Sequence, residues 1–390
     1  MTVRSHSRLP SRRIDKVMVA LIIILAAAGL GIVYEASVAY AFRVFGDKYH
    51  FFFLQAGWMF LGFVGMLILS KVSLGSIAKI SPWFFGISIF FLLFVLISTP
   101  FAPQVYGARR WLIINPSPLP EFPLLGRIGF QPSELVKLSG IIFVSAMLSS
   151  AKMDKSKKWV SARNLFVVVL LVSAIVAAEP NFTTAFVIML IFLSIYFISD
   201  PYSILYLIMS LPVIGIIVSV YIFSAEYRKA RIIALIKPDS VDSTGLGYQI
   251  KQIMIALGSG GFFGLGLGQS RQKYSYLPEV TADSIFAIIG EEFGFIGTTL
   301  ILALFVSIIW RGLLLAERCK DKFNTLLITG VTMWIAVQTL INLGAMVRIL
   351  PITGIPLPLI SYGGSSTVFI MWGLGLLLNA SRNVEVKEEK

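Results

Sequence analysis

Apolar stretches of nearly membrane-spanning length recur along this 390-residue chain and restrict its fold more than any other feature. A helix needs roughly 20 apolar residues to cross about 30 Å of hydrocarbon. The segments that reach or approach this length are 17–34, 51–70, 83–99, 133–150, 164–179, 181–199, 202–223, 284–310, 324–345 and 364–380. They predict an all-α polytopic membrane protein with about ten transmembrane helices and two long extracytoplasmic loops.

The composition supports this class and excludes several kinds of site. Hydrophobic residues make up 57% of the chain and charged residues only 14%, whereas a soluble domain carries about 25% charged residues. One cysteine, Cys319, and two histidines exclude a disulfide framework and a zinc or histidine metal cluster. The net charge of +13 favours anionic lipids or an anionic substrate. It does not indicate nucleic acid, because most of the charge lies in short loops.

The distribution of Lys and Arg predicts the orientation of the chain. If the N-terminus is cytoplasmic and the spans alternate, the short cytoplasmic segments hold most of these residues, which is the usual bias. Both termini are then cytoplasmic. We expect a basic tail (1–16), a single transmembrane domain (17–380) that contains the large outer loop 224–283, and a second cytoplasmic tail (381–390).

The two outer segments, 100–132 and 224–283, are longer than connectors need to be. Loops of this length are usually functional or disordered, and their aromatic and apolar content argues against disorder. Within the second loop, residues 249–268 form an apolar, glycine-rich stretch that is too broken for a span and favours a re-entrant or interfacial element. No Gly-Lys-Ser/Thr follows, which excludes a P-loop, so the glycines are expected to pack against neighbouring helices.

Asp283 is the first candidate for chemistry. It stands where the basic, glycine-rich loop meets an apolar helix, and a carboxylate at a membrane surface needs a partner or a function. The alternative interpretation is a helix N-cap, because Asp is favoured at that position and the apolar helix begins at Ser284.

Several cations follow the same loop. Arg228, Lys229 and Arg231 open it, and Arg271 and Lys273 stand near its end. Arg and Lys at a membrane surface bind phosphate groups. These residues are therefore expected either to contact a phosphorylated substrate or to anchor the protein to lipid headgroups.

Charged residues inside the spans form the remaining candidates. Glu134 and Lys137 lie at i and i+3, on one face of the fourth span, which favours a buried ion pair. One of Glu291 and Glu292 should face the bundle interior. Glu179 stands at a span boundary before Pro180. The uncharged run 349–366 is rich in Pro, Gly and hydroxyl residues and predicts a rigid outer loop.

Together these motifs resemble the SEDS family, whose members include FtsW, RodA and SpoVE, and the resemblance covers nearly the whole chain. The matching pieces are Gly107–Trp111, Gln131–Leu138, Tyr248-Gln249, Gly264–Gly268, Tyr276–Glu279, Asp283, Ile285–Ala287, Glu291-Glu292 and Pro356–Ser366. The text around Tyr276–Glu279 is nearer to FtsW, the division member, whereas the run Pro356–Ser366 is shared with RodA.

The resemblance implies ten spans in a bacterial cytoplasmic membrane and polymerisation of lipid II, a disaccharide-pentapeptide on undecaprenyl pyrophosphate. It also implies a class B penicillin-binding protein as partner, within the divisome or the elongasome. The family's catalytic aspartate matches Asp283. The family's His-Thr-Asp-Phe is Thr281-Ala282-Asp283-Ser284 here, and its Pro-Asp turn is Pro180-Asn181, so neither a histidine nor an aspartate is available at those two places.

For this chemistry Asp283 would be the general base that activates a sugar hydroxyl. Cations would stabilise the departing pyrophosphate, and a divalent ion such as Mg²⁺ could share that role, although no metal motif is visible. The expected substrate contacts are Arg228, Arg231, Arg271, Lys273, Arg109 and Lys137. The expected supporting residues are Glu134, Lys137, Glu279, Glu292, Ser361 and Ser365.

Other functions are open at this stage. A lipid II flippase or another transporter would also use intramembrane charges and broken helices, such as Glu134, Lys137 and the Glu179-Pro180 break. The two halves of the chain show no convincing repeat, which weakens that interpretation. A scaffold that only positions a penicillin-binding partner is a third possibility, and an elongation polymerase of the RodA type is a fourth.

Overall fold

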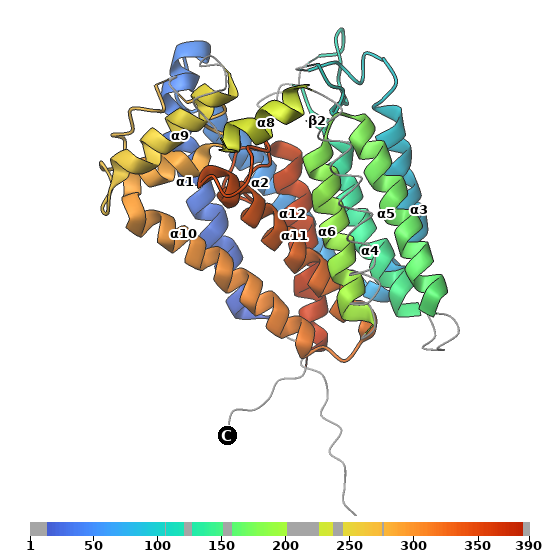
Figure 1. Cartoon of the computed structure of the whole chain (residues 1–390). Helices are drawn as coiled ribbons and strands as arrows, with labels where there is room; N and C mark the ends of the chain where they lie inside the picture. The colour runs from blue at the N-terminus through green and yellow to red at the C-terminus, as the bar shows by residue number, and fades with distance from the viewer. Residues whose placement is uncertain are drawn as a thin grey trace, which may run out of the picture.

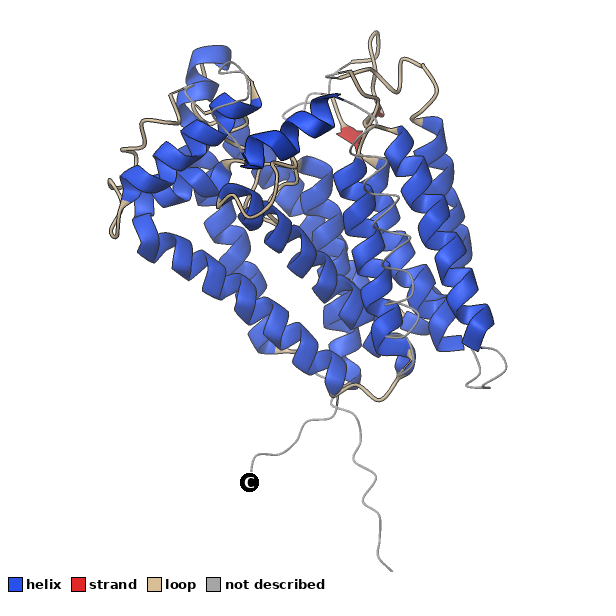
Figure 2. Cartoon of the chain, in the orientation of Figure 1, coloured by secondary structure: helices blue, strands red, loops and turns tan. Residues whose placement is uncertain are grey.

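The computed structural model describes residues 14–105, 107–120, 127–150, 158–200, 226–236, 245–274 and 277–384. Within them, eight helices are long and apolar enough to cross a membrane (Figures 1 and 2). These are α1 (Lys16–Phe45), α2 (His50–Leu69), α3 (Leu74–Phe94), α4 (Pro132–Ser150), α6 (Phe182–Ser199), α10 (Ile285–Glu317), α11 (Lys322–Met346) and α12 (Gly364–Ala380).

The predicted all-α membrane fold is confirmed. Helix α5 (Lys158–Ala178) contains a further apolar stretch, 162–178, at the place of the expected span 164–179. The expected span 202–223 lies outside the described residues. The chain is therefore a multi-pass membrane protein, and nine of its expected spans correspond to helices in the described part.

Helix α3 begins nine residues before the predicted start at residue 83, because Pro82 lies inside the helix rather than before it. Ser73 caps its N-terminus by accepting a bond from the Ser76 N–H. Proline cannot donate to the carbonyl four residues earlier. The Ser81 hydroxyl donates to that Ala78 carbonyl instead, at 2.8 Å, so the backbone stays satisfied where water is scarce.

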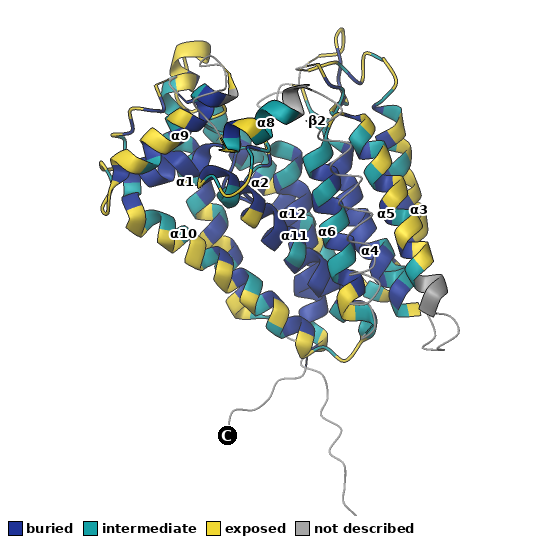
Figure 3. Cartoon of the chain, in the orientation of Figure 1, coloured by how far each residue is buried: buried dark blue, intermediate teal, exposed yellow. Residues whose placement is uncertain are grey.

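Three helices form the centre of the bundle. In the most apolar window of each helix, 83% of the residues of α11 and of α12 are buried and 72% of those of α4, against 17% for α10. Figure 3 shows the same contrast, with dark blue helices in the middle and yellow residues along the outer ones. One continuous hydrophobic core cluster runs through the bundle, so α10 and its neighbours present apolar faces that suit lipid.

The two ends of the bundle differ. At one end Asp15, just before α1, donates its N–H to Ser381 in the short helix η3 (Ser381–Asn383) and accepts from Arg311 of α10. At the other end α1 finishes, α4 and α12 begin, and Asp283 leads into α10. We call the latter the Asp283 end.

The two loops that were predicted to be long lie at the Asp283 end and carry structure of their own. The first contains a small antiparallel pair, β1 (Leu112–Ile113) and β2 (Gly129–Phe130). The second, 224–283, was predicted as a loop but contains α8 (Glu226–Ile236) and α9 (Leu246–Gly260). Helix α8 crosses this end of the bundle (Figure 1), where the Arg348 guanidinium donates to the Leu235 carbonyl at 3.1 Å.

The glycine-rich segment after α9 docks onto a kink in α10. The kink is at Gly294, whose positive φ of 62° frees backbone groups on either side. The N–H groups of Leu265 and Gly266 donate to the carbonyls of Glu291 and Glu292, and Phe295 N–H donates to the Gly261 carbonyl. A side chain at Gly264 would collide with the Glu292 backbone. The expectation that these glycines serve close packing is confirmed.

The segment between α11 and α12, residues 347–363, begins at the surface but does not stay there. Ile355, Leu357 and Ile360 are buried, and the Leu359 carbonyl lies where a side chain at Gly29, in the middle of α1, would have to be. Irregular backbone at this depth is tolerated only where protein or a cavity surrounds it. The segment therefore enters the bundle from the Asp283 end instead of covering it (Figure 2).

Candidate active site

Asp283 lies in the turn that precedes α10 and is only 6% exposed. The cap position belongs to Ser284, and α10 has no side-chain cap bond. The alternative N-cap role is thus not what the side chain does. The hydrogen bond that reaches the Asp283 carboxylate comes from the Ser284 hydroxyl and is long, at 3.4 Å, so the carboxylate keeps most of its capacity to accept a proton.

Three segments meet around this turn and fix its position. The side-chain amide of Asn342, on α11, donates to the carbonyl of Asp283 at 2.9 Å and to that of Ile355 at 2.8 Å. The Tyr362 N–H donates to the Thr281 carbonyl at 2.8 Å. The Gln249 amide of α9 donates to the Ser284 hydroxyl at 3.2 Å. Asp283 is therefore held through its main chain while its side chain stays available.

The surroundings raise the pKa of Asp283 to about 6. Burial is the largest cause, because it disfavours the charged form, and the nearby negative charge of Glu279 acts in the same direction. The Ser284 hydroxyl and the positive charge of Arg231 partly offset them. A carboxyl group with a pKa near 6 is ionised at neutral pH and still basic enough to take a proton, which is the range that general bases use.

The predicted cations divide into two groups. Arg231, on α8, is the cation that acts on Asp283, and its Nε is buried without a hydrogen-bond partner among the described residues. Lys229 lies on the same helix, Arg271 is exposed, and the side chain of Arg228 falls outside the described part.

Lys273 differs from the expectation of a free surface cation. It is 2% exposed, and its ammonium group lies 2.8 Å from Glu292 and 3.4 Å from Glu35. Two carboxylates already balance its charge, so in this structure Lys273 holds the loop to α10 and α1. Its contact with a pyrophosphate stays a prediction.

Both Glu291 and Glu292 are buried, although the sequence indicated that only one would face inward. The Glu291 carboxylate accepts from the Ser270 hydroxyl and from the N–H groups of Arg271 and Gln272. Glu292 accepts from the Ser270 N–H in addition to Lys273. Both residues are needed because the loop between the glycines and Asp283 lacks regular hydrogen bonding of its own. Glu292 has the supporting position that was predicted.

The ion pair predicted in the fourth span is present. The ammonium nitrogen of Lys137 lies 2.7 Å from Glu134 Oε1, and both side chains are almost fully buried. Lys137 also donates to Gln338 Oε1 at 3.3 Å and lies 5.1 Å above the Trp334 ring. The second oxygen of Glu134 has no hydrogen-bond partner in the described part of the chain.

Helix α11 connects this pair to the candidate base. Gln338, which contacts Lys137, and Asn342, which holds the Asp283 backbone, are four residues apart and so share one face of the helix. One turn of helix, about 5.4 Å of rise, separates them. The pair and the carboxylate belong to one polar strip inside an apolar bundle.

The remaining predicted residues lie around this strip. Ser365 accepts from the Gln131 N–H at the start of α4, and Ser361 accepts from the Leu357 N–H, so both support the segment beside Asp283. The guanidinium of Arg109 donates to the Ser98 hydroxyl at 3.0 Å. Glu279 is exposed. Its main-chain carbonyl accepts from the Ala282 and Ser284 N–H groups, and its side chain acts on Asp283 through its charge.

Arg110 and Glu179 form a separate contact. Arg110 donates to the main-chain carbonyls of Glu179 and Pro180 and so clamps the turn between α5 and α6. The Glu179 carboxylate is buried, and this burial raises its pKa to about 8 despite the charge of Arg110. The carboxyl group is therefore mostly neutral at physiological pH.

Sequence reasoning missed the amides Asn342 and Gln338, and it gave Gln249 no role although it matched the family there. Each is an uncharged polar residue that is at most 9% exposed, and Asn342 and Gln338 lie in a membrane-spanning helix. Polar side chains inside spans are expensive without a partner. That rule, applied to Asn and Gln as well as to charges, would have found them.

A metal centre is not evident in the part of the chain that the structure describes, where no three His, Cys, Asp or Glu side chains come together. Asp283 and Glu279 are the two carboxyl groups that interact at the site. They could share a divalent cation only with other ligands, such as the phosphates of a substrate.

Comparison with known proteins places this geometry in a family. The family model described as "Cell cycle protein" (FTSW_RODA_SPOVE) matches residues 15–386. Stage V sporulation protein E of Bacillus subtilis (strain 168) is 35% identical over 373 residues, 94% of this chain and 97% of that protein. A probable peptidoglycan glycosyltransferase FtsW of Geobacter sp. (strain M18) is 33% identical over 94% of this chain and 96% of its own length.

Solved structures agree on the fold. A chain from a peptidoglycan synthase complex that coordinates polymerization and crosslinking superimposes with a TM-score of 0.75 at 24% identity, over 95% of this chain and 98% of that one. The rod shape determining protein RodA of Thermus thermophilus gives a TM-score of 0.64 at 22% identity, over 96% and 98% of the two chains. On the match along almost its whole length, the chain belongs to the FtsW/RodA/SpoVE family of cell cycle proteins.

Proposed function

We propose that this protein is a peptidoglycan glycosyltransferase that polymerises lipid II into glycan strands, with Asp283 as the general base. The observation that carries the proposal is a buried carboxylate that Asn342 fixes through its backbone and whose bond from the Ser284 hydroxyl is long. Burial raises its pKa to about 6. Family membership and relatives that are named peptidoglycan glycosyltransferases support the reaction class.

The mechanism follows from the charges around Asp283. The carboxylate accepts the proton of the 4-hydroxyl of one sugar as that oxygen attacks the anomeric carbon of another. The bond from that carbon to the lipid pyrophosphate breaks, and the pyrophosphate leaves with its electron pair. Arg231 offers a planar fork of donors that suits phosphate oxygens, and Arg228, Arg271 and Arg109 are the further cations we assign to this role.

Lys137 and Lys273 contribute differently in this proposal. Both ammonium groups are paired with carboxylates in the interior, so they shape the site and would reach a phosphate only after rearrangement. A divalent cation such as Mg²⁺ would be held mainly by the pyrophosphate, beside Asp283 and Glu279, and would neutralise its charge.

The cellular setting completes the proposal. The Asp283 end faces outward, both termini are cytoplasmic, and a class B penicillin-binding protein is the partner. The excess of Lys and Arg in the short segments at the opposite end supports the orientation. The resemblance to a synthase complex supports a partner of this kind. The names of the relatives, FtsW and stage V sporulation protein E, favour division or sporulation over elongation.

Substitution of the base tests the proposal. Purified Asp283→Asn should lose lipid II polymerisation by at least about 10²–10⁴-fold, because general bases contribute that much, while Asn keeps the size of the side chain. The products are measured by gel electrophoresis of labelled lipid II. Glu317→Gln, at the far end of α10, is the matched control and should keep wild-type activity.

The rival functions predict other outcomes. If Asp283→Asn polymerises lipid II within a few-fold of wild type, Asp283 is not the base. If the wild-type protein, with its partner, moves labelled lipid II across a vesicle membrane without forming polymer, the protein is a transporter. If it does neither, and only stimulates a penicillin-binding protein, it is a scaffold.

A further inference from the structure

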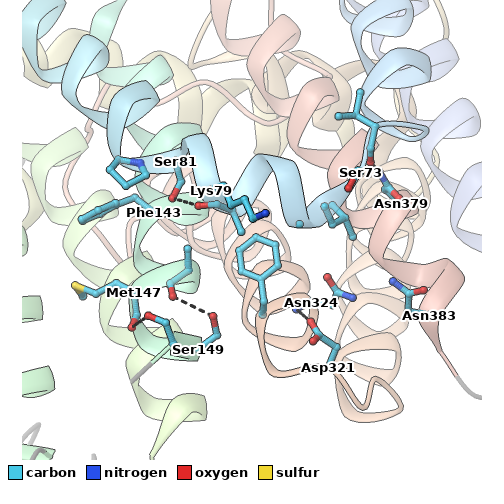
Figure 4. Close-up of a pocket in the computed structure, with 18 of the residues that line it drawn as sticks. Ser73, Lys79, Ser81, Phe143, Met147, Ser149, Asp321, Asn324, Asn379 and Asn383 are labelled. Carbon is cyan, nitrogen blue, oxygen red and sulfur yellow. Dashed lines mark hydrogen bonds between the residues drawn. The ribbon is translucent and has the colours of Figure 1, made fainter. Parts of the chain in front are cut away.

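A cavity of about 790 Å³ opens at the end of the bundle opposite Asp283 (Figure 4). Its walls come from the starts of α3 and α11, the end of α4 and the segment after α12. Ligand pockets have volumes of about 300–1,000 Å³, and this open cavity falls within that range.

The cavity is separate from the candidate active site. Asn324 lines it near the start of α11, and Asn342 holds the Asp283 backbone near the end of the same helix. Eighteen residues of helix span about 27 Å. An occupant here cannot touch the reacting groups, so this site does not depend on the proposed reaction.

The mouth of the cavity is positively charged. Lys71 and Lys79 line it and are exposed, and Lys79 extends along it in Figure 4. The first turn of α3, with Leu74 and Gly75, and that of α11 also line it, and helix N-termini favour anions. Asp321 is the one carboxylate in the lining, and its Oδ1 already accepts the Asn324 N–H. Two lysines and one aspartate leave the lining with one net positive charge, which suits a group with a single negative charge.

Asn324 adds a second requirement on the occupant. Its side chain is 5% exposed and lines the cavity, and its Oδ1 is a buried acceptor with no hydrogen-bond partner in the described part of the chain. That oxygen has almost no accessible surface, so an occupant of the cavity does not reach it. The NH2 group of the amide is the part of Asn324 that can donate to an oxygen of the occupant.

The remaining wall is apolar. Pro82 and Leu74 from α3, Phe143 and Met147 from α4, and Phe323 from α11 line it. Figure 4 shows Phe143 and Met147 on the side away from Asp321 and Asn324. The occupant therefore has an anionic head and an apolar body.

We propose that this cavity binds one molecule of an anionic phospholipid with a single negative charge, such as phosphatidylglycerol. The phosphate lies at Lys71 and Lys79, the Asn324 amide donates to a headgroup oxygen, and an acyl chain covers the wall formed by Phe143 and Met147.

Native mass spectrometry of the full chain in detergent tests the site, with synthetic phosphatidylglycerol as the probe. The double variant Lys71→Gln/Lys79→Gln should bind it about thirty-fold more weakly, the fold-change that corresponds to roughly 1 kcal/mol for each lysine near a lipid phosphate. Asn324→Leu should bind it more weakly as well. The matched control is Lys48→Gln, an exposed lysine at the Asp283 end, which should bind like wild type.

Two further probes use the wild-type protein and do not depend on how the variants fold. Phosphatidylcholine, which has no net charge, should bind more weakly than phosphatidylglycerol. Soluble glycerol 3-phosphate should compete poorly because it lacks the apolar body. Equal binding of both lipids, wild-type affinity in the double variant, or full competition by glycerol 3-phosphate would each overturn the proposal, the last in favour of a soluble phosphate ligand.

Discussion

Glu134 and Asp283 are both buried carboxylates near the same end of the bundle, yet their surroundings are opposite. Glu134 sits on a regular helix with an ammonium group 2.7 Å away. Asp283 sits on an irregular turn, and the contact to its carboxylate is a long bond from a hydroxyl. Arg231 acts on it only through its charge.

The difference separates a carboxylate that stabilises the fold, Glu134, from one that is available for chemistry, Asp283. A buried carboxylate with a close counter-ion has its charge balanced by that partner. A buried carboxylate without one is held at a free-energy cost, and burial of this kind clusters at functional sites. The two sites are linked through α11, where Gln338 contacts Lys137 and Asn342, four residues later, holds the Asp283 backbone. The bundle thus uses one polar strip for two purposes.

The largest effect is expected from breaking the ion pair. Glu134→Ala or Lys137→Ala leaves an uncompensated charge in the interior and should destabilise the fold by about 3–5 kcal/mol. The double substitution Glu134→Leu/Lys137→Leu should recover part of that loss, because no charge is left behind. Folded yield and thermal midpoint in detergent measure both. A wild-type midpoint in either single variant would show that the pair does not stabilise the fold.

Removing the charge at Asp283 should have the opposite effect on stability, because it should stabilise the fold. The pKa of this carboxyl is about 6 in the folded protein against 3.8 for an ordinary Asp. The folded state therefore binds a proton more readily, and its stability falls as pH rises from about 4 to about 6. Above that range the penalty is constant at about 3 kcal/mol. Asp283→Asn should raise the thermal midpoint at pH 7.5, and the gain should disappear at pH 4.

An equal gain in thermal midpoint at both pH values would mean that the gain does not come from the raised pKa of Asp283. The contrast with Glu134 makes the test sharp, since removing one buried carboxylate destabilises the protein and removing the other stabilises it. A site that is more stable without its reactive group is the usual trade between activity and stability.

Sequence reasoning found the helices better than it found what holds the site. Hydropathy predicts a span wherever about 20 apolar residues stand together, and it located nine helices of the described part. It misplaced the start of α3 because a proline usually marks a helix boundary. The bond from the Ser81 hydroxyl that compensates for Pro82 cannot be predicted from helix propensities. It also missed α8, which is amphipathic and short, and it predicted an interfacial element at 249–268 where α9 spans Leu246–Gly260.

The site itself was predicted only in part. Asp283 and the pair Glu134–Lys137 were found because charges in an apolar setting are conspicuous. The partners of Lys273 were not predicted, because Glu35 and Glu292 lie on helices that are far apart in the sequence. Only the tertiary structure brings them together. The entry of residues 347–363 into the bundle depends on the absence of a side chain at Gly29, which no local pattern reveals.

Loosening the support of Asp283 should have a smaller effect than removing its charge. Asn342→Leu removes both amide bonds, to the carbonyls of Asp283 and Ile355. Asn342 is a positioning residue, so kcat should fall by about ten- to hundred-fold, as expected for a displacement of about 1 Å, with little change in KM. A KM effect alone, or a kcat loss that thermal destabilisation fully explains, would remove Asn342 from this role.

The smallest effect concerns pH and separates the charges around the base. A general base works only when it is ionised, so the polymerisation rate should rise with pH to a plateau, with its midpoint near the Asp283 pKa of about 6. Glu279→Gln removes a negative neighbour and should move the midpoint to lower pH, by less than about one unit. Arg231→Gln removes a positive neighbour and should move it to higher pH.

Initial rates between pH 5 and 8 measure both shifts, with Glu317→Gln as the control. Shifts of the same sign in the two variants, or none, would mean that the acid limb belongs to another group, and Glu179, whose pKa is about 8, would be the next carboxyl to test.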